Sequence, residues 1–216
     1  MSYAVKELFY TLQGEGAQSG RAAVFLRFSG CNLWNGLDRD RERGTGGCSR
    51  WCDTDFVGTN GPGGGRFASA EDLADAVAAA WPPNMGTSAR PMVVCTGGEP
   101  LLQLDAPLIE ALHERGFFLA IETNGTRPVP AGVDWVCVSP KAGTDLVQKK
   151  GHELKLVYPQ PGFEPGQFES LEFEHFFLQP MDGPERSRNT TQAMQFCLSH
   201  PQWRLGIQMH KSAGFP

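Results

Sequence analysis

The run AAVFLRFSGC, residues 22–31, is the most informative stretch of this sequence. Its β-branched and aromatic residues predict a strand, and the Ser-Gly pair near its end stops that strand. Cys31 therefore follows the carboxyl end of the strand. Cys48 and Cys52 come next, in the spacing C-x16-C-x3-C. These three thiols can converge on one point, so Cys31, at the end of the first predicted strand, is a candidate metal ligand.

Six further runs have the same character: PMVVCT (91–96), FFLAIETNG (117–125), DWVCVSPK (134–141), HELKLVYP (152–159), HFFLQPM (175–181) and WRLGIQMH (203–210). Each predicts a strand. Apolar residues at helical spacing lie between several of them, over 69–82, 100–116 and 188–200. The first of these begins with Ser69 three residues before Asp72, which predicts a capping box. Strand and helix alternate, so we expect a parallel sheet.

The connections limit how far this sheet can close. The link from ETNG (122–125) to DWVCV (134–138) is too short for a crossover helix, and 216 residues do not accommodate a full eight-fold barrel. We therefore predict an α/β fold in which parallel strands form an incomplete TIM-like barrel, as a single domain over residues 1–216. The Gly-, Asp- and Arg-rich stretch 35–66 has little apolar periodicity, which predicts a long functional loop.

Composition excludes several classes of protein. The net charge is -5, with 19 basic and 24 acidic residues mixed along the chain, so no basic stripe is available for nucleic acid. No apolar run approaches the roughly 20 residues that cross a bilayer, and Lys6 and Glu7 interrupt the place of a signal peptide. We therefore expect a cytoplasmic protein without a membrane span. In that reducing compartment, six cysteines are metal ligands or buried thiols rather than a disulfide framework.

The triplet of cysteines favours an iron-sulfur cluster. Three thiolates hold three irons of a 4Fe-4S cube and leave the fourth iron open to a non-protein ligand, which indicates chemistry. The alternative is a structural zinc site, which four Cys or His ligands normally close, but the nearest histidine in sequence is His113. The remaining cysteines lie within apolar patterns, and we assign them to the core: Cys95, Cys137 and Cys197.

With TGGEP at 96–100 after the strand PMVVC, the triplet resembles the radical S-adenosylmethionine superfamily. In that superfamily the Gly-Gly turn receives the amino group of S-adenosylmethionine, and Gly97 and Gly98 allow such a close backbone approach. An ordinary alternative for Glu99-Pro100 is a helix start, with an acid near the positive end of the helix dipole.

Further motifs resemble the 7-carboxy-7-deazaguanine synthase family over nearly the full length: YTLQGEG (10–16), RFSGCNLW (27–34), CDTDF (52–56), ETNG (122–125), VSPK (138–141), LQPMDG (178–183) and the terminal MHK. The resemblance implies conversion of 6-carboxy-5,6,7,8-tetrahydropterin to 7-carboxy-7-deazaguanine with loss of ammonia, in queuosine and 7-deazapurine biosynthesis. It implies a partial barrel, a homodimer, magnesium, and an external flavodoxin- or ferredoxin-like electron donor. One departure is the three-residue gap Ser49-Arg50-Trp51, where the superfamily usually has two.

The resemblance also assigns residues to the cofactors. A reduced 4Fe-4S cluster on Cys31, Cys48 and Cys52 would pass one electron to S-adenosylmethionine, and the resulting 5'-deoxyadenosyl radical would take hydrogen from C6 of the pterin. Thr54 would bind magnesium, whereas Asp53 and Asp55 are alternatively solvated loop acids. The residues expected around S-adenosylmethionine are Trp51, Cys52, Asp53, Gly98, Ser139, Pro140, Lys141, Gln179, Pro180, Met181 and Asp182. The alternative for Ser139-Pro140 is an ordinary strand end.

Arg27 is the substrate residue best supported by the pattern itself. In VFLRFS it shares a face with Phe25 and Ser29, opposite Leu26, and its guanidinium can form a two-pronged pair with a substrate carboxylate. Alternatively it pairs with a structural acid. By resemblance, further substrate contacts are Leu12, Gln13, Gly14, Thr96, Glu122, His210 and the C-terminal carboxylate of Pro216. Glu122 suits the two N–H donors of a pterin edge, and His210 is alternatively a structural histidine.

Two other readings compete with this one. Glycyl-radical activases belong to the same superfamily, but they lack the combination of LQGEG, ETNG and terminal MHK found here. A non-catalytic metal-binding module would use the cysteines only to stabilise the long loop. Such a module predicts a colourless zinc protein that does not respond to S-adenosylmethionine.

Overall fold

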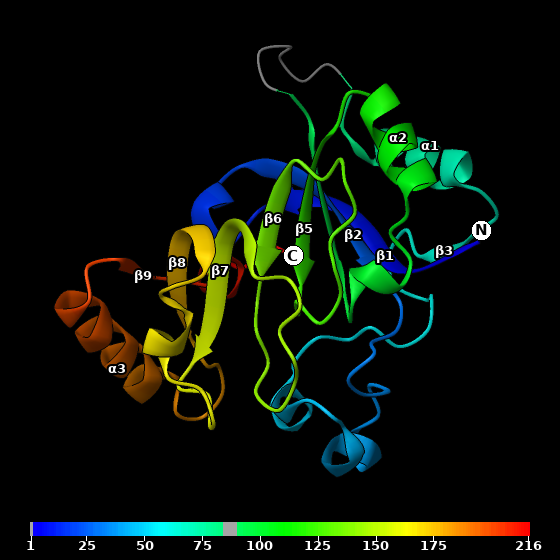
Figure 1. Cartoon of the computed structure of the whole chain (residues 1–216). Coiled ribbons are helices and arrows are strands. Elements are labelled where there is room, and N and C mark those ends of the chain that lie inside the picture. Colours follow the sequence, from blue (N-terminus) through cyan, green and yellow to red (C-terminus); the bar gives the residue numbers. More distant parts are fainter. Residues whose placement is uncertain (1, 84–89) are drawn as a thin grey trace.

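A computed structural model describes residues 2–83 and 90–216 (Figure 1). Within them, nine strands form one sheet in the order β3-β1-β2-β4-β5-β6-β7-β8-β9. The strands are β1 (Tyr3–Leu12), β2 (Ala22–Phe28), β3 (Gly65–Phe67), β4 (Met92–Gly97), β5 (Phe118–Thr123), β6 (Trp135–Val138), β7 (Lys150–Tyr158), β8 (Glu172–Pro180) and β9 (Trp203–Leu205). The helices are α1 (Ala70–Ala80), α2 (Ala106–Glu114), α3 (Arg186–Ser199) and α4 (Met209–Ala213).

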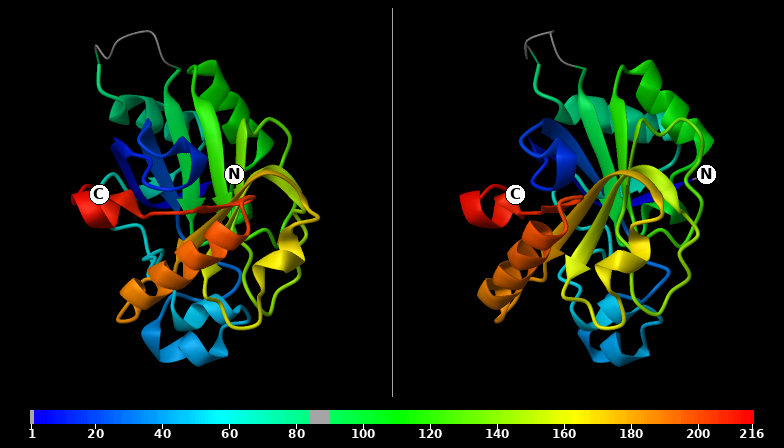
Figure 2. Two further views of the ribbon diagram at one scale, coloured as in Figure 1. Left: turned by 90° about the vertical axis from the view of Figure 1, so that its left-hand side faces the viewer. Right: turned by 60° about the vertical axis from the view of Figure 1, so that its left-hand side comes forward.

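The seven strands from β2 through β4 to β9 run parallel, as predicted, and the sheet curves without closing. This is the predicted α/β partial barrel. Figure 2 shows the curved sheet from the side, with its open edges apart. The links from β5 to β6 and from β6 to β7 contain no helix, which agrees with the short connections in the sequence. All nine strands of the described residues belong to one sheet.

The expectation of a wholly parallel sheet is wrong at one edge. β1 runs antiparallel to β2, with Tyr10 opposite Val24, and β3 runs antiparallel to β1. A short connection joins β1 to β2, so the chain reverses without the crossover that parallel pairing needs. The sequence pattern missed β1 because Lys6 and Glu7 break its apolar alternation. Lys6 is nevertheless buried, since its ammonium donates to Val57 O and Asn60 Oδ1.

A second correction concerns residues 203–210, which the pattern predicts as one strand. Only β9 is extended, and α4 begins at Met209. The helices elsewhere follow their patterns: Ser69 caps α1 by accepting from Asp72 N, as its spacing predicts. None of the helices in the described part of the chain has the length and apolar character that a membrane crossing requires.

Candidate active site

A cavity of about 460 Å³ lies at the carboxyl ends of the parallel strands. In Figure 1 the arrows of β5, β6 and β7 point toward the segment that carries Cys48 and Cys52. Ligands bind at this end of α/β sheets because the strand ends and their loops converge there. The cavity is lined by residues of β1, β2, β4, β5, β7 and β8, of the loops that follow β1, β2, β4, β5 and β6, and of the segment after β9.

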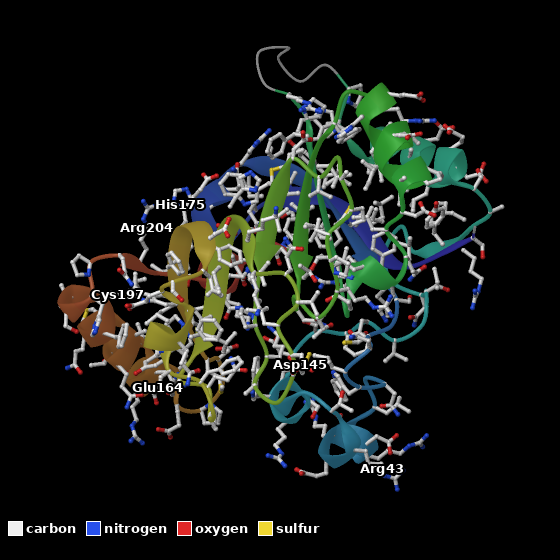
Figure 3. All side chains as sticks on the ribbon, viewed as in Figure 1. Arg43, Asp145, Glu164, His175, Cys197 and Arg204 are labelled. Atoms are coloured by element: carbon white, nitrogen blue, oxygen red, sulfur yellow. The ribbon has the colours of Figure 1, made fainter. Side chains whose placement is uncertain are left out.

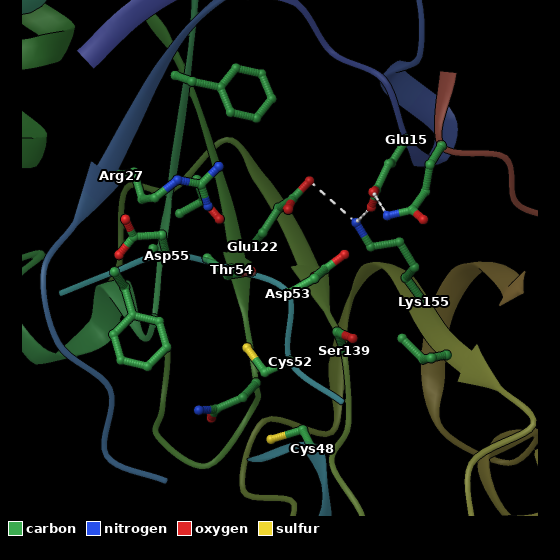
Figure 4. Close-up of a pocket in the computed structure, with 18 of the residues that line it drawn as sticks. Glu15, Arg27, Cys48, Cys52, Asp53, Thr54, Asp55, Glu122, Ser139 and Lys155 are labelled. Carbon is green, nitrogen blue, oxygen red and sulfur yellow. Dashed lines mark hydrogen bonds and ion pairs between the residues drawn. The ribbon is translucent and has the colours of Figure 1, made fainter. Parts of the chain in front are cut away.

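The three predicted cluster ligands all line this cavity. Cys31 follows β2, and its sulfur accepts from Leu33 N at 3.4 Å. Cys48 lies in a short 3-10 turn, η3 (Gly47–Arg50), and Cys52 N donates to Cys48 O at 2.7 Å. This turn accommodates the three-residue gap and keeps both thiols on the cavity side (Figure 4).

None of the three thiols is part of a disulfide. Burial raises the pKa of Cys31, and it raises the pKa of Cys48 to about 11. The positive charge of Lys141 partly opposes this effect at Cys48. Thiolates are the form that binds iron, so replacing these protons with iron removes the penalty that burial places on each thiolate.

The donor set fits a 4Fe-4S cluster better than a single ion. In residues 2–83 and 90–216, no three His, Cys, Asp or Glu side chains are arranged around one metal position. A cube binds each of three thiolates through a different iron, so the sulfurs need not meet at one point. The other cysteines lie elsewhere. Cys95 is buried in the apolar core, whereas Cys137 is buried beside the charged side chain of Glu153 on the neighbouring strand. Cys197 lies on α3, well apart from Arg43 of the loop that contains Cys48 (Figure 3).

The glycine turn after β4 is packed directly against the Cys31 segment. A side chain on Gly98 would collide with Gly30 O, and Glu99 N donates to Gly30 O at 3.0 Å. Glu99 is fully buried, caps the short turn at Leu101 N, and accepts from Thr123 Oγ1. The structural interpretation of Glu99 is therefore correct, and the glycines serve this packing whatever ligand they meet.

Seven of the residues predicted around S-adenosylmethionine line the cavity: Trp51, Cys52, Asp53, Gly98, Ser139, Lys141 and Gln179. Lys141 donates to Ser139 Oγ at 2.6 Å, and its ammonium lies 5.8 Å from the centre of the Trp51 ring. Both polar atoms of the Gln179 side chain are buried without a hydrogen-bond partner within the described residues. Such an orphaned amide is costly to bury, so Gln179 is ready for a polar ligand.

Four predicted cofactor residues are not part of the cavity lining: Pro140, Pro180, Met181 and Asp182. Met181 O accepts from Asn189 Nδ2 on α3, and Asp182 pairs with Lys211. These residues shape the turns that present their neighbours.

All eight predicted substrate residues line the same cavity: Leu12, Gln13, Gly14, Arg27, Thr96, Glu122, His210 and Pro216. Arg27 donates through Nε to Glu7 Oε1 at 2.6 Å, so a structural acid does hold it. Only Nε takes part in that bond, and its two other nitrogens keep no protein partner in the described residues. Figure 4 shows Arg27 directed toward the cavity.

A buried ionic network beneath these residues was not predicted. Lys155 of β7 lies 2.5 Å from Glu15 and 3.3 Å from Glu122, and it is 5% exposed (Figure 4). Glu122 also accepts from Gln13 Nε2 at 3.0 Å. Burial raises the pKa of Glu15, but Lys155 and a hydrogen bond from Gln208 outweigh it and lower that pKa to about 2.

The alternation used for Arg27 would have found this lysine. In HELKLVYP, Leu154 and Leu156 face the core, so Lys155 must face the other side of the sheet.

Thr54, the predicted magnesium residue, also lines the cavity, and ion pairs hold both of its acidic neighbours. Asp55 lies 2.7 Å from Lys6, and Asp53 lies 2.6 Å from Lys211. Both acidic side chains are also more than half exposed, so they are solvated loop acids that take part in surface ion pairs. Although burial lowers the pKa of Lys211, its hydrogen bonds to Asp182 and Asp53 raise it above its ordinary value.

Comparisons with known proteins identify the family. A 7-carboxy-7-deazaguanine synthase from Bordetella pertussis is 62% identical over 216 residues, covering 100% of both chains. One from Caulobacter vibrioides is 61% identical over 216 residues with the same coverage. The chain belongs to the 7-carboxy-7-deazaguanine synthase family. The crystal structure of QueE from Escherichia coli has a TM-score of 0.71 at 28% identity, covering 97% of this chain and 95% of that one. No family model matches the chain.

Membership of the synthase family decides between the alternative interpretations of the cysteine triplet. It is a radical S-adenosylmethionine family, so the resident cofactors are a 4Fe-4S cluster and S-adenosylmethionine. The zinc module and the activase readings are therefore wrong. The three cavity thiols are the donors in this structure that fit the cluster.

Proposed function

We propose that this chain contracts 6-carboxy-5,6,7,8-tetrahydropterin to 7-carboxy-7-deazaguanine with loss of ammonia, by radical chemistry from S-adenosylmethionine. The observation that carries this proposal is the meeting of three free thiols and a carboxylate-binding arginine in one cavity of about 460 Å³. When bound, the cluster and S-adenosylmethionine supply the 5'-deoxyadenosyl radical. Cys31, Cys48 and Cys52 would hold the cluster, and Ser139, Lys141 and Gln179 would contact the cofactor.

Arg27 would bind the substrate carboxylate. Its bond to Glu7 fixes the guanidinium plane through Nε and leaves the two terminal nitrogens for a two-pronged contact. Glu7 thus orients the arginine without occupying its binding edge. Thr54 would bind magnesium near the same carboxylate, because this hard cation prefers oxygen ligands and keeps several waters.

Glu122 would receive the N–H groups of the pterin edge. Lys155 and Gln13 hold this carboxylate at the cavity wall. A fixed, charged acceptor binds N–H donors more strongly than a neutral one. Leu12, Gly14, Thr96, His210 and Pro216 would complete the substrate walls. A side chain on Gly14 would meet His210 Nδ1 at 2.8 Å, so only glycine allows this histidine so close.

The same resemblance implies an oligomeric state, a cellular compartment and an electron donor. We propose a single domain that forms a homodimer in the cytoplasm and takes electrons from a flavodoxin- or ferredoxin-like protein. The six unpaired cysteines support a reducing compartment.

The test is anaerobic reconstitution with iron and sulfide, followed by reduction and incubation with S-adenosylmethionine, magnesium and 6-carboxy-tetrahydropterin. Formation of 7-carboxy-7-deazaguanine, detected by mass spectrometry, supports the proposal. Cleavage of S-adenosylmethionine without that product would mean that the radical chemistry holds but the substrate is wrong. Chain extension beyond Pro216 by a tag should reduce turnover, because Pro216 lines the cavity and its backbone oxygen accepts from Thr11 Oγ1 at 2.8 Å.

A further inference from the structure

The segment 206–216 covers one side of the cavity but is weakly anchored. It contributes His210 and Pro216 to the cavity, yet the five-residue helix α4 has no buried residue. Ile207 is 55% exposed. A helix of one turn is not stable alone, so the position of this segment depends on tertiary contacts. Apolar burial supplies little of that stability, which leaves polar contacts to supply it.

One side chain of this segment reaches two separate parts of the cavity rim. Lys211 Nζ lies 2.6 Å from Asp53 Oδ2 and 2.6 Å from Asp182 Oδ2, and the lysine side chain is 23% exposed. Asp53 follows the cluster ligand Cys52. Asp182 follows the end of β8, the strand that carries Gln179. Asp182 has a second, longer pair with Arg186 at 3.8 Å, whereas Asp53 pairs only with Lys211 in the described residues.

We propose that Lys211 is a positioning residue that couples the two ligands of the site. It ties the segment carrying His210 and Pro216 to the two segments that hold S-adenosylmethionine, so each ligand strengthens the binding of the other. The inference rests on the proposed function, because it takes the pterin as the ligand of His210 and Pro216.

The physical basis is linkage. A bound S-adenosylmethionine orders the Asp53 and Asp182 segments, and the lysine bridge transmits that order to the substrate wall. Coupling between two sites is reciprocal and typically amounts to about 5- to 150-fold in affinity. Gln208 and Pro216 keep their own hydrogen bonds to Glu15 and Thr11 without the bridge, but residues 209–214 lose their ion pairs to the Asp53 and Asp182 segments. The pterin must then supply more of the order of these residues, and it binds more weakly.

The first readout needs no cofactor. Hydrogen exchange of the backbone amides in 209–214 is measured in the full chain and in Lys211→Met, which keeps the aliphatic stem and removes the charge. We expect exchange there to accelerate by about threefold or more, and Lys211→Arg to restore protection. Unchanged exchange in Lys211→Met would overturn the anchoring role.

The chain offers a matched control. Arg115 also bridges two acids, Glu71 and Asp75, and its side chain is 20% exposed, but it joins α1 to α2 away from the cavity. Arg115→Met should leave exchange in 209–214 and both ligand affinities unchanged. The same acceleration in both variants would mean general destabilisation and would overturn the specific role of Lys211.

The second readout is equilibrium binding to the reconstituted, unreduced protein. Affinity for 6-carboxy-tetrahydropterin is measured with and without saturating S-adenosylmethionine. In the unaltered chain we expect the cofactor to improve pterin affinity by about fivefold or more, and in Lys211→Met by less than about twofold. Equal enhancement in both proteins would overturn the coupling. If the unaltered chain binds no pterin, the proposed function fails and the coupling with it, while the exchange result still decides the anchoring role.

Discussion

The two faces of β7 are equally buried and chemically opposite. Leu154 and Leu156 are 0% exposed and lie in the apolar core, whereas Glu153 and Lys155 are 2% and 5% exposed on the other face. Apolar side chains gain free energy simply by leaving water. Charged groups lose it, so each must find a partner: Glu153 accepts from Ala17 N, and Lys155 pairs with Glu15 and Glu122.

This difference teaches how one strand serves both stability and chemistry. The apolar face holds the sheet together without specifying any partner. The charged face depends on residues from the loop after β1, from β5 and from the C-terminal segment, and so it fixes where those elements lie relative to one another. Substitutions on the apolar face should therefore lower mainly the stability of the protein, whereas substitutions on the charged face should lower its turnover as well.

The largest expected difference in turnover is between substitutions of the cluster ligand Cys52 and of the core residue Cys95. Cys52→Ala should abolish turnover, by on the order of 1,000-fold or more, because the cluster loses one of three protein ligands. Cys95→Ala, on the core side, should keep the cluster and lose on the order of 1 kcal/mol of unfolding free energy. Iron content, visible absorption and urea unfolding check both variants. A catalytically active Cys52→Ala protein would contradict the cluster assignment.

Lys155→Met tests the charged face. Removal of the ammonium leaves Glu15 and Glu122 uncompensated in a buried site, which costs about 3–5 kcal/mol of unfolding free energy. Turnover should fall as well, since Glu122 loses its fixed position. Urea unfolding and product formation are the measurements. A variant as stable as the original chain would mean that water reaches this network.

Leu154→Ala tests the apolar face one residue away. The cavity that it leaves should cost about 2–5 kcal/mol of unfolding free energy. Below the unfolding transition the variant should keep its cluster and most of its turnover, because Leu154 does not line the active-site cavity. A large loss of turnover in a folded Leu154→Ala protein would show that the two faces are not independent.

The smallest effect concerns pH. The pKa of Glu15 is lowered to about 2 in the fold, below its ordinary value near 4.5. A lowered pKa contributes stability that is present above the unfolded-state value and is lost as pH falls through the folded-state value. The stability advantage of the unaltered chain over Glu15→Gln should therefore shrink between pH 5 and 2, by on the order of 1 kcal/mol or more. The measurement is the urea unfolding midpoint of both proteins at several pH values between 5 and 2. A difference in midpoint that stays constant over this range would contradict the prediction.

Sequence patterns predicted much of this molecule because they act locally. The alternation in residues 22–31 correctly separated Arg27 from Leu26, and the spacing of Ser69 and Asp72 correctly predicted the cap of α1. Motifs after strands identified the cavity-lining residues, because the carboxyl ends of parallel strands meet at one edge. β1 escaped prediction because Lys6 is buried through contacts with residues more than fifty positions away.

Residue order alone was enough to predict the alternation of strands and helices, the open barrel, the cysteine triplet and the family. Each of these depends on the order of residue types along a short stretch or at matching motifs. Only the tertiary structure decided which charges are partners: Glu7 with Arg27, Glu15 and Glu122 with Lys155, and Asp53 and Asp182 with Lys211. Ion pairs join residues distant in the chain, and no local pattern specifies which acid a lysine will meet once the sheet has curved.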